Sequence, residues 1–154
     1  MNKKTISIIL LIIFIITIIL TLANAFLEEN NTLENQTGTL TIENKTVKYE
    51  KAGKCLEVID GNTIQVYGVG RVQLTQVKTP NSEPGLSNAK SFVEDKCLGK
   101  TVYLNIDDKC PKDRYDRTLA IVYTDGSDIN RELIDNGLAN VSYFPPSEFK
   151  KGEV

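Results

Sequence analysis

Histidine is absent from the 154-residue sequence, and its absence excludes imidazole as a general base, as the partner of a nucleophile and as a metal ligand. The chain has three cysteines, Cys55, Cys97 and Cys110, and no two of them have the C-x-x-C spacing that is typical of thiolate metal sites. Zinc-dependent chemistry and Ser-His chemistry are therefore not expected from this protein.

A large excess of basic residues is also missing. Lys and Arg total 18 against 20 Asp and Glu, which gives a formal net charge of -2. A mildly acidic chain produces no long-range field that would draw it to a polyanion. Any binding of nucleic acid must therefore depend on a local cluster of basic side chains.

The N-terminus carries a long apolar run. Two lysines precede an uncharged segment from Ile6 to Leu22, and Ala23-Asn24-Ala25 has the small-x-small form of a signal-peptidase site. The run of about 17 residues is longer than a usual signal core and just long enough to span a bilayer. We expect residues 1–25 to be either a cleaved signal peptide, with a mature start at Phe26, or a retained membrane anchor. In both cases the lysines stay in the cytoplasm, which places the rest outside the cell or on the outer face of the cytoplasmic membrane.

An oxidising compartment makes a disulfide reasonable, although one of the three cysteines must stay unpaired. If Leu98 to Ile106 contains a strand, its ends lie about 20 Å apart, which is too far for Cys97 to reach Cys110. Cys55 is then the expected partner of one of them. The alternative is that the cysteines stay unpaired and act as small apolar residues.

Residues 26–47 are rich in Asn, Thr and Glu and show no periodicity. Such a segment cannot bury enough apolar surface to offset its ordering entropy, so we expect a disordered polar linker. Glycosylation sequons begin at Asn30, Asn35, Asn44 and Asn140, although chance matches are common in a stretch of this composition.

From about residue 48 the pattern is that of a small β-barrel. Asp60-Gly61-Asn62 separates two runs that are rich in β-branched and aromatic residues, and its glycine permits a turn. Alternation of apolar side chains predicts five strands, over 56–59, 63–67, 71–77, 102–106 and 119–123.

Two helices are predicted among these strands. Apolar residues recur at helical spacing from Leu86 to Cys97, and Gly99 supplies a stop. A second helix is expected from the N-cap Asp128 to Asn136. The fold class is therefore mainly β with α: a five-stranded OB-fold barrel with one helix between strands three and four and a second helix after strand five.

Three motifs lie in the predicted barrel: Val58-Ile59-Asp60-Gly61-Asn62-Thr63, Val77-Lys78-Thr79-Pro80 and Asp113-Arg114-Tyr115-Asp116-Arg117. In this order and spacing they resemble the thermonuclease (staphylococcal nuclease-like) family, which reads D-G-D-T, R-L-x-x-x-D-T-P-E and D-[RK]-Y-G-R. The resemblance covers about residues 54–143 and implies such a domain over 48–154. It also implies a calcium ion held by carboxylates, a glutamate that activates water and two arginines that clamp the phosphate.

Most of the acidic residues on which that chemistry depends are replaced. The family's metal aspartates fall on Asn62 and Lys78, and its base glutamate falls on Asn81, which is neither acid nor base. The corresponding metal site would comprise Asp60, Asn62, Lys78 and Thr79, but an ammonium group in the metal position repels Ca²⁺. Two like unit charges about 4 Å apart cost on the order of 4 kcal/mol at an effective dielectric near 20. We therefore expect no cofactor, and Ca²⁺ only if the domain is an active enzyme.

One of the two phosphate-binding arginines of the related motifs is retained, and the other is replaced. The first falls on Gln73 and the second on Arg117. Asp116 stands where the family has glycine, and it offers Arg117 an intramolecular partner. Two substitutes are conceivable: Arg71, on the same strand face as Gln73 but displaced by about 7 Å, and Glu83 as a replacement base.

These replacements favour an exported or membrane-anchored domain that is catalytically degenerate. It would retain at most binding of single-stranded nucleic acid or a nucleotide phosphate, since arginines and tyrosine faces serve this purpose in OB barrels. The alternatives are an active calcium-dependent secreted nuclease and a cell-surface protein-interaction domain. We expect a monomer that contacts the membrane through its N-terminal segment if that segment is uncleaved. The residues expected to bind the ligand are Arg114, Tyr115, Arg117 and Tyr143.

Overall fold

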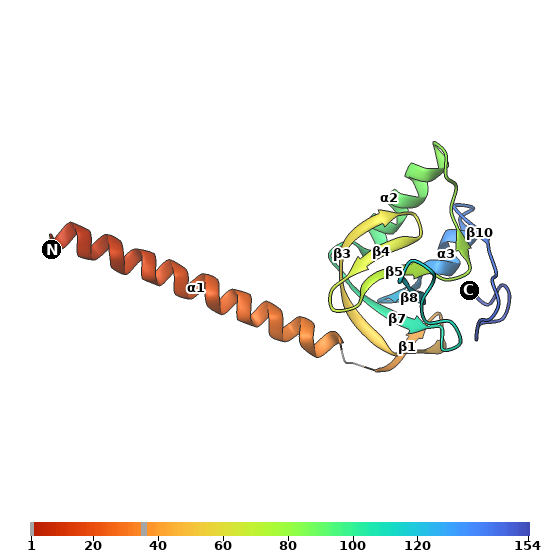
Figure 1. Cartoon of the computed structure of the whole chain (residues 1–154), viewed down its shortest axis with the longest axis horizontal. Helices are drawn as coiled ribbons and strands as arrows, with labels where there is room; N and C mark the ends of the chain where they lie inside the picture. The colour runs from red at the N-terminus through yellow and green to blue at the C-terminus, as the bar shows by residue number, and fades with distance from the viewer. Residues whose placement is uncertain (1, 35–36) are drawn as a thin grey trace.

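The computed structural model describes residues 2–34 and 37–154, with a long helix at one end and a barrel domain at the other (Figure 1). The helices are α1 (Lys3–Glu34), α2 (Gly85–Cys97) and α3 (Ile129–Asp135). The strands are β1 (Gly38–Ile42), β2 (Lys45–Tyr49), β3 (Lys51–Asp60), β4 (Thr63–Val66), β5 (Gly70–Leu74), β6 (Val77–Lys78), β7 (Thr101–Ile106), β8 (Thr118–Thr124), β9 (Ser127–Asp128) and β10 (Asn140–Val141).

Five strands close into the predicted barrel. Strands β5, β4, β3, β7 and β8 are neighbours in that order and pair antiparallel. The parallel pairing of β5 with β8, where Gln73 lies opposite Leu119, closes the sheet on itself. Alternate side chains of each strand point inward, and residues such as Ile64, Val72 and Leu104 are fully buried. The barrel prediction is therefore confirmed.

Both predicted helices are also present, close to their expected ends. Helix α2 lies between β6 and β7 and packs the buried side chains of Ala89, Val93 and Cys97 against the barrel. At α3 the Asp128 carboxylate accepts a hydrogen bond from the Arg131 backbone N–H at 3.0 Å, as an N-cap residue does. The turn at Gly61 allows α2 to approach, because a Cβ atom there would lie 2.6 Å from Cβ of Ala89.

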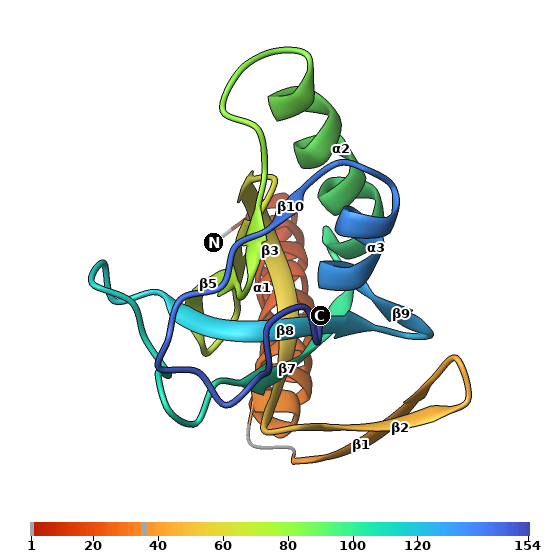
Figure 2. The same cartoon turned by 90° about the vertical axis from the view of Figure 1, so that its right-hand side faces the viewer.

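The structure differs from the predicted disordered linker over 26–47. Helix α1 continues to Glu34, and β1 and β2 form an antiparallel hairpin, which Figure 2 shows beside the barrel. Composition hid this hairpin because its few apolar side chains alternate and all reach one face. Residues 35 and 36 lie outside the described residues. A second buried cluster joins the hairpin to the barrel and the C-terminus: Ile42, Ile121, Tyr123, Phe149 and Val154, with Leu40 and Val47 packed against it.

The three cysteines, all in the described part of the chain, are unpaired. The disulfide expected at Cys55 is not formed. Cys55 and Cys97 are buried, and burial raises the pKa of the Cys55 thiol to about 11 and that of Cys97 to about 12. They act as the small apolar residues of the alternative interpretation.

Asn130 is a buried polar residue that connects α3 to the barrel. Its Oδ1 accepts from the Val122 backbone N–H at 2.9 Å, and its Nδ2 donates to the Thr75 carbonyl oxygen at 2.9 Å. We expect Asn130→Ala to lower the free energy of unfolding by about 3 kcal/mol, because both backbone groups would stay buried without a partner. Asn136→Ala, at the exposed end of the same helix, is the control and should cost less than about 1 kcal/mol. Urea unfolding measures both, and equal losses would contradict this role.

Candidate nucleotide-binding pocket

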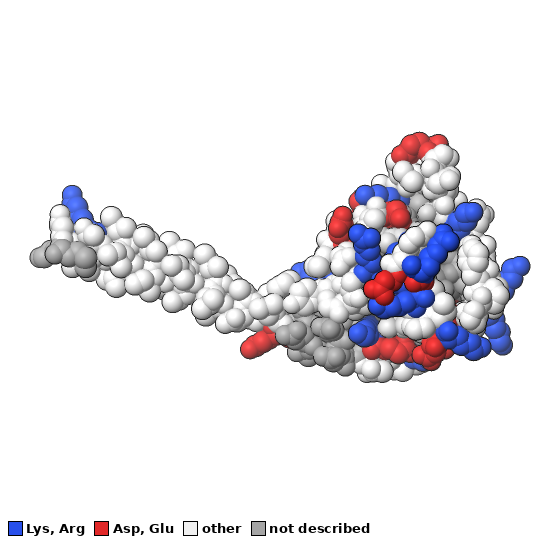
Figure 3. All heavy atoms as spheres, in the orientation of Figure 1, with Lys and Arg blue, Asp and Glu red and all other residues white. Residues whose placement is uncertain are grey.

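A pocket of about 720 Å³ opens beside β5 and β6. Its other walls come from the loop between β7 and β8 and from the segment that follows β10. Figure 3 shows the face of the molecule that Figure 1 presents, where basic and acidic side chains lie next to one another. The side chains used in the argument below are Asn62, Gln73, Lys78, Asp107, Asp113, Arg114, Tyr115, Arg117 and Phe144, all of which line the pocket.

The fold brings part of the predicted site together. The residues from the predicted set that line the pocket are Asn62, Gln73, Lys78, Arg114, Tyr115 and Arg117. Gln73 comes from β5 and the other five come from the three motifs. The barrel brings these segments together because β4 pairs with β5 while β5 pairs with β8. The predicted residues outside the lining are Asp60, Thr79, Asn81, Glu83 and Tyr143.

Arg117 is held by Asp113 and not by Asp116. The Asp113 Oδ2 atom lies 2.8 Å from Nε and 2.6 Å from Nη2 of Arg117, and its Oδ1 accepts from the backbone N–H of Tyr115 and of Arg117. Burial alone would raise the pKa of the Asp113 carboxyl. The hydrogen bonds from Arg117 and Tyr115 outweigh burial and lower this pKa, so the carboxylate stays charged beside the guanidinium.

The partner that we predicted for Arg117 is therefore wrong. Asp116 instead contacts Lys112, with Oδ1 and Nζ 2.6 Å apart. Its φ of +62° also explains why the related motif has glycine there, since the left-handed region favours glycine. Asp tolerates this region better than most residues do.

Two guanidinium groups lie close to the Tyr115 ring. Its ring centroid is 4.7 Å from Cζ of Arg114 and 5.3 Å from Cζ of Arg117. Cation–π contacts of this kind hold both arginines near the ring. The Tyr115 side chain is 63% exposed, which leaves an aromatic surface open for stacking with a ligand.

Asn62 and Gln73 form a polar, uncharged part of the lining, which we call the floor, and the buried Thr63 lies behind it. The Thr63 hydroxyl accepts from Nη1 of Arg117 at 3.4 Å, and it lies 3.4 Å from Oε1 of Gln73 and from Oδ1 of Asn62. Thr63 and Gln73 face each other directly in the β4–β5 register. The Arg117 guanidinium and the Gln73 amide therefore contact the same Thr63 hydroxyl.

A calcium ion does not fit the residues present. Nδ2 of Asn62 donates to the Val77 carbonyl oxygen at 2.9 Å, and Oδ1 of Asp60 accepts from the Asn62 backbone N–H. The exposed Lys78 puts a positive charge on the same wall. Among the residues that the structure describes, no group of three or more His, Cys, Asp and Glu could hold a metal ion. Calcium needs several oxygen ligands, preferably anionic, and this wall does not supply them.

Neither of the two conceivable substitutes lines the pocket. The Glu83 carboxylate accepts from the Ser87 hydroxyl at 2.6 Å and from the Ser87 backbone N–H at 3.3 Å, so it stabilises the first turn of α2. Arg71 is exposed and lies opposite Gln65 at the far end of β5. Both side chains are therefore placed away from the residues that would need them.

Sequence reasoning missed two residues that shape the pocket. Asp107, only 1% exposed, accepts from the backbone N–H of Lys109, Cys110 and Glu148 and from the Ser147 hydroxyl, which joins the β7–β8 loop to the C-terminal segment. Phe144, rather than the predicted Tyr143, lines the pocket and is 78% exposed. Two of the four partners of Asp107, Ser147 and Glu148, lie about forty positions away along the chain, and no local signal identifies them.

Comparison with known proteins agrees with this barrel fold. A sequence model described as staphylococcal nuclease homologue matches residues 71–153, more than half of the chain. The chain belongs to this family. It is 35% identical to a thermonuclease of Staphylococcus intermedius over 101 residues, which cover 59% of this chain and 60% of the relative.

Two further relatives carry nuclease names. A thermonuclease of Staphylococcus hyicus is 33% identical over 108 residues, covering 64% of this chain and 63% of the relative. A prophage-derived endonuclease of Bacillus subtilis (strain 168) is 32% identical over 111 residues, covering 62% of this chain and 38% of the relative. The chain thus spans about 60% of the length of the two thermonucleases and less of the endonuclease.

Proposed function

We propose that this protein is an exported or membrane-anchored, catalytically degenerate member of the family that binds single-stranded nucleic acid or a nucleotide phosphate without calcium. The observation that carries the proposal is the charge inside the pocket. Lys78, Arg114 and Arg117 supply three cations against the two carboxylates of Asp113 and Asp107, so the lining carries an excess of one positive charge. Asp113 is paired with Arg117, and Asp107 accepts hydrogen bonds from backbone N–H groups.

Phosphate recognition falls mainly to Arg117. Two of its nitrogen atoms, Nε and Nη2, are engaged with Asp113, which fixes the plane of the guanidinium. The contact of Nη1 with the Thr63 hydroxyl is 3.4 Å, which is long for a hydrogen bond, so this nitrogen is the one available to a phosphate. A pre-oriented guanidinium loses little conformational freedom when it binds a phosphate. Lys78 would neutralise the same phosphate as a point charge, in the place of a metal ion.

Base recognition falls to the two exposed aromatic rings. Tyr115 and Phe144 come from different segments and line the same pocket. Stacking on aromatic rings tolerates any base and contributes about 1–3 kcal/mol for each base in single-strand complexes. This combination favours a flexible single strand or a free nucleotide over a duplex, whose bases are already stacked.

Hydrolysis is not supported by the same residues. Asn81 cannot accept a proton from water at neutral pH, and Gln73 supplies no charge for the developing transition state. The competing proposal is an active secreted nuclease, which the names of the relatives favour. A protein-interaction domain is the third candidate, and it requires no nucleotide affinity.

We expect a fluorescent single-stranded oligothymidylate to bind equally well in EDTA and in calcium, because Lys78 supplies the charge that a metal would otherwise supply. Affinity should fall as salt rises, because phosphate binding releases counterions. Fluorescence anisotropy measures binding, and gel analysis of the same samples measures cleavage. Loss of binding in EDTA, or cleavage in calcium, would support the active nuclease. No binding in low salt would favour the interaction domain.

A further inference from the structure

Helix α1 extends away from the barrel as a separate rod (Figure 1). Its apolar span, Lys4–Glu28, has 25 residues and contains an 18-residue window with a mean hydropathy of 3.2, none of which is buried. At 1.5 Å per residue the span is about 37 Å long, which exceeds the hydrocarbon core of a bilayer, about 30 Å thick. The helix is thus long and apolar enough to cross a membrane.

The end of this span contacts the barrel. The Phe26 ring lies edge-on to the Tyr67 ring with a centroid distance of 6.1 Å, and Nζ of Lys54 lies 5.3 Å from the Phe26 ring centroid. Phe26 is two residues before the end of the span. If α1 crosses a bilayer, Tyr67 and Lys54 therefore lie at the level of the lipid headgroups. Tyrosine and lysine are residues that favour this level.

Two exposed leucines continue the same surface. Leu56 is 47% exposed and Leu98 is 48% exposed. They are neighbours because the Cys55 carbonyl oxygen accepts from the Gly99 N–H, while the Cys55 N–H donates to the Lys100 carbonyl oxygen, each at 2.9 Å. We call Lys54, Leu56, Tyr67, Leu98 and Lys100 the anchor-proximal patch.

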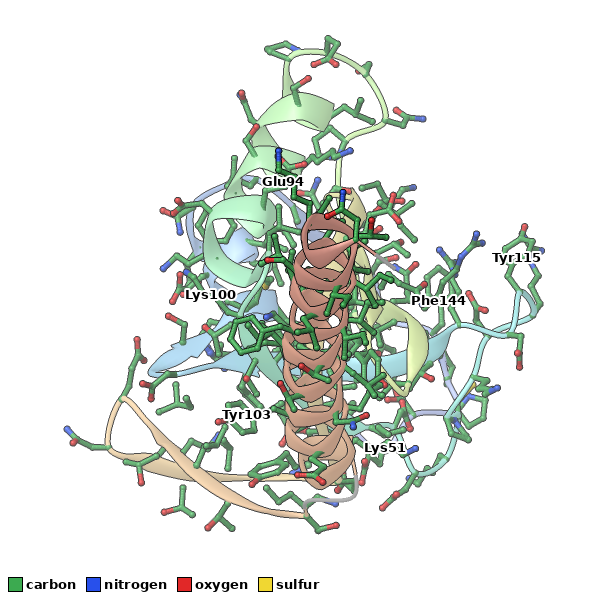
Figure 4. All side chains as sticks on the ribbon, turned by 90° about the vertical axis from the view of Figure 1, so that its left-hand side faces the viewer. Lys51, Glu94, Lys100, Tyr103, Tyr115 and Phe144 are labelled. Atoms are coloured by element: carbon green, nitrogen blue, oxygen red, sulfur yellow. The ribbon has the colours of Figure 1, made fainter. Side chains whose placement is uncertain are left out.

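We propose that α1 is retained as a membrane anchor and that the anchor-proximal patch lies on the surface of an anionic bilayer. Leu56 and Leu98 would enter the interfacial layer, and Lys54 and Lys100 would contact phosphate headgroups. Figure 4 looks along α1 and shows Lys100 and one further lysine, Lys51, on opposite sides of the helix. The contact of Phe26 with this patch makes it continuous with the anchor.

The same orientation leaves the nucleotide-binding pocket in water. In Figure 4 the labelled Tyr115 and Phe144 lie to one side of α1, away from its axis. The pocket would open sideways, parallel to the membrane plane, and a dissolved strand could reach it. The membrane proposal does not depend on nucleotide binding, because its residues are separate from those that line the pocket.

The absence of tryptophan from the sequence allows a direct test. The full chain carrying Leu98→Trp, or Leu56→Trp as a second variant, is reconstituted in vesicles of equal parts phosphatidylcholine and phosphatidylglycerol. The control is Phe144→Trp in the same vesicles. We expect the Leu98→Trp and Leu56→Trp emission to shift to the blue and to lose most of its intensity when the lipids carry bromine on their acyl chains. The emission of the control should stay that of a residue in water.

The contribution of the lysines is tested in the Leu98→Trp background. Lys54→Glu together with Lys100→Glu should reduce quenching while the chain still floats with the vesicles, because α1 is unchanged. The proposal is overturned if Leu98→Trp and Leu56→Trp are quenched no more than Phe144→Trp. It is also overturned if the protein recovered from bacterial cells begins at Phe26 and is found in the medium instead of the membrane fraction.

Discussion

Calcium-dependent cleavage of single-stranded DNA should appear when Asn62→Asp, Lys78→Asp, Gln73→Arg and Asn81→Glu are combined in this chain. The first two changes replace an amide and a cation on one wall of the pocket with two carboxylates. Calcium prefers anionic oxygen ligands, and removal of the Lys78 ammonium also removes the repulsion of the metal. Gln73→Arg places a second guanidinium across the floor from Arg117, where charge develops on the phosphate.

The expected gain is at least about 10³-fold over the parent chain, since a general base contributes about 10²–10⁴-fold and one positioned charge donor about 10²–10³-fold. Position 81 lies in an exposed loop outside the pocket lining. The glutamate introduced at position 81 is therefore expected to raise the rate only after the other three changes have been made. Cleavage of a fluorescent oligonucleotide at graded calcium concentrations measures the gain.

A stepwise series separates the roles of these positions. The pair Asn62→Asp and Lys78→Asp should bind calcium by calorimetry yet cleave almost nothing. The addition of Gln73→Arg should raise the affinity for the oligonucleotide, and Asn81→Glu should then raise the rate. If the parent chain already cleaves in calcium as fast as the combined variant, the proposed degeneracy is refuted. If the pair binds no calcium, Lys78 is not what excludes the metal.

The barrel could be predicted from the sequence because its signals are local. Alternation over 102–106 and helical spacing from Leu86 to Cys97 each depend on residues a few positions apart, and each element is present. The hairpin of β1 and β2 was missed because the argument averaged composition over 26–47. Its stability comes from Tyr49 packed on Tyr103, with ring centroids 4.9 Å apart, and from contacts with residues beyond 120.

The candidate site was predictable where a motif fixed both spacing and residue type. Arg117 and Tyr115 line the pocket for this reason. The partner of Arg117 was not predictable, because Asp113 and Asp116 are both near it in sequence and only the backbone turn selects between them. The backbone of Asp116 has φ +62°, and its side chain contacts Lys112 instead. Asp107 was missed because the partners that connect it to the C-terminal segment, Ser147 and Glu148, lie about forty residues away.

Arg117→Ala should weaken binding of single-stranded DNA by about 10- to 100-fold, because a hydrogen-bonded contact with a charged group contributes about 1.5–3 kcal/mol. Arg117→Lys should recover only part of the loss, since lysine keeps the charge but not the bidentate geometry. Arg114→Lys is the matched control and should change affinity little, because the related motif accepts either residue there. Anisotropy titrations at low salt measure all three variants.

Variants of Asp113 and Asp116 show whether the affinity for the phosphate depends on the orientation of Arg117 or on the net charge of the pocket. Asp113→Asn removes the carboxylate that fixes Arg117 through Nε and Nη2, so affinity should fall although the pocket becomes more positive. Asp116→Gly also removes one negative charge next to Arg117. The Asp116 carboxylate contacts Lys112 and not Arg117, so the affinity should change less than about twofold. Tighter binding by Asp113→Asn would mean that net charge controls affinity. Weaker binding there, together with unchanged binding in Asp116→Gly, requires a guanidinium that is held in place before the phosphate arrives.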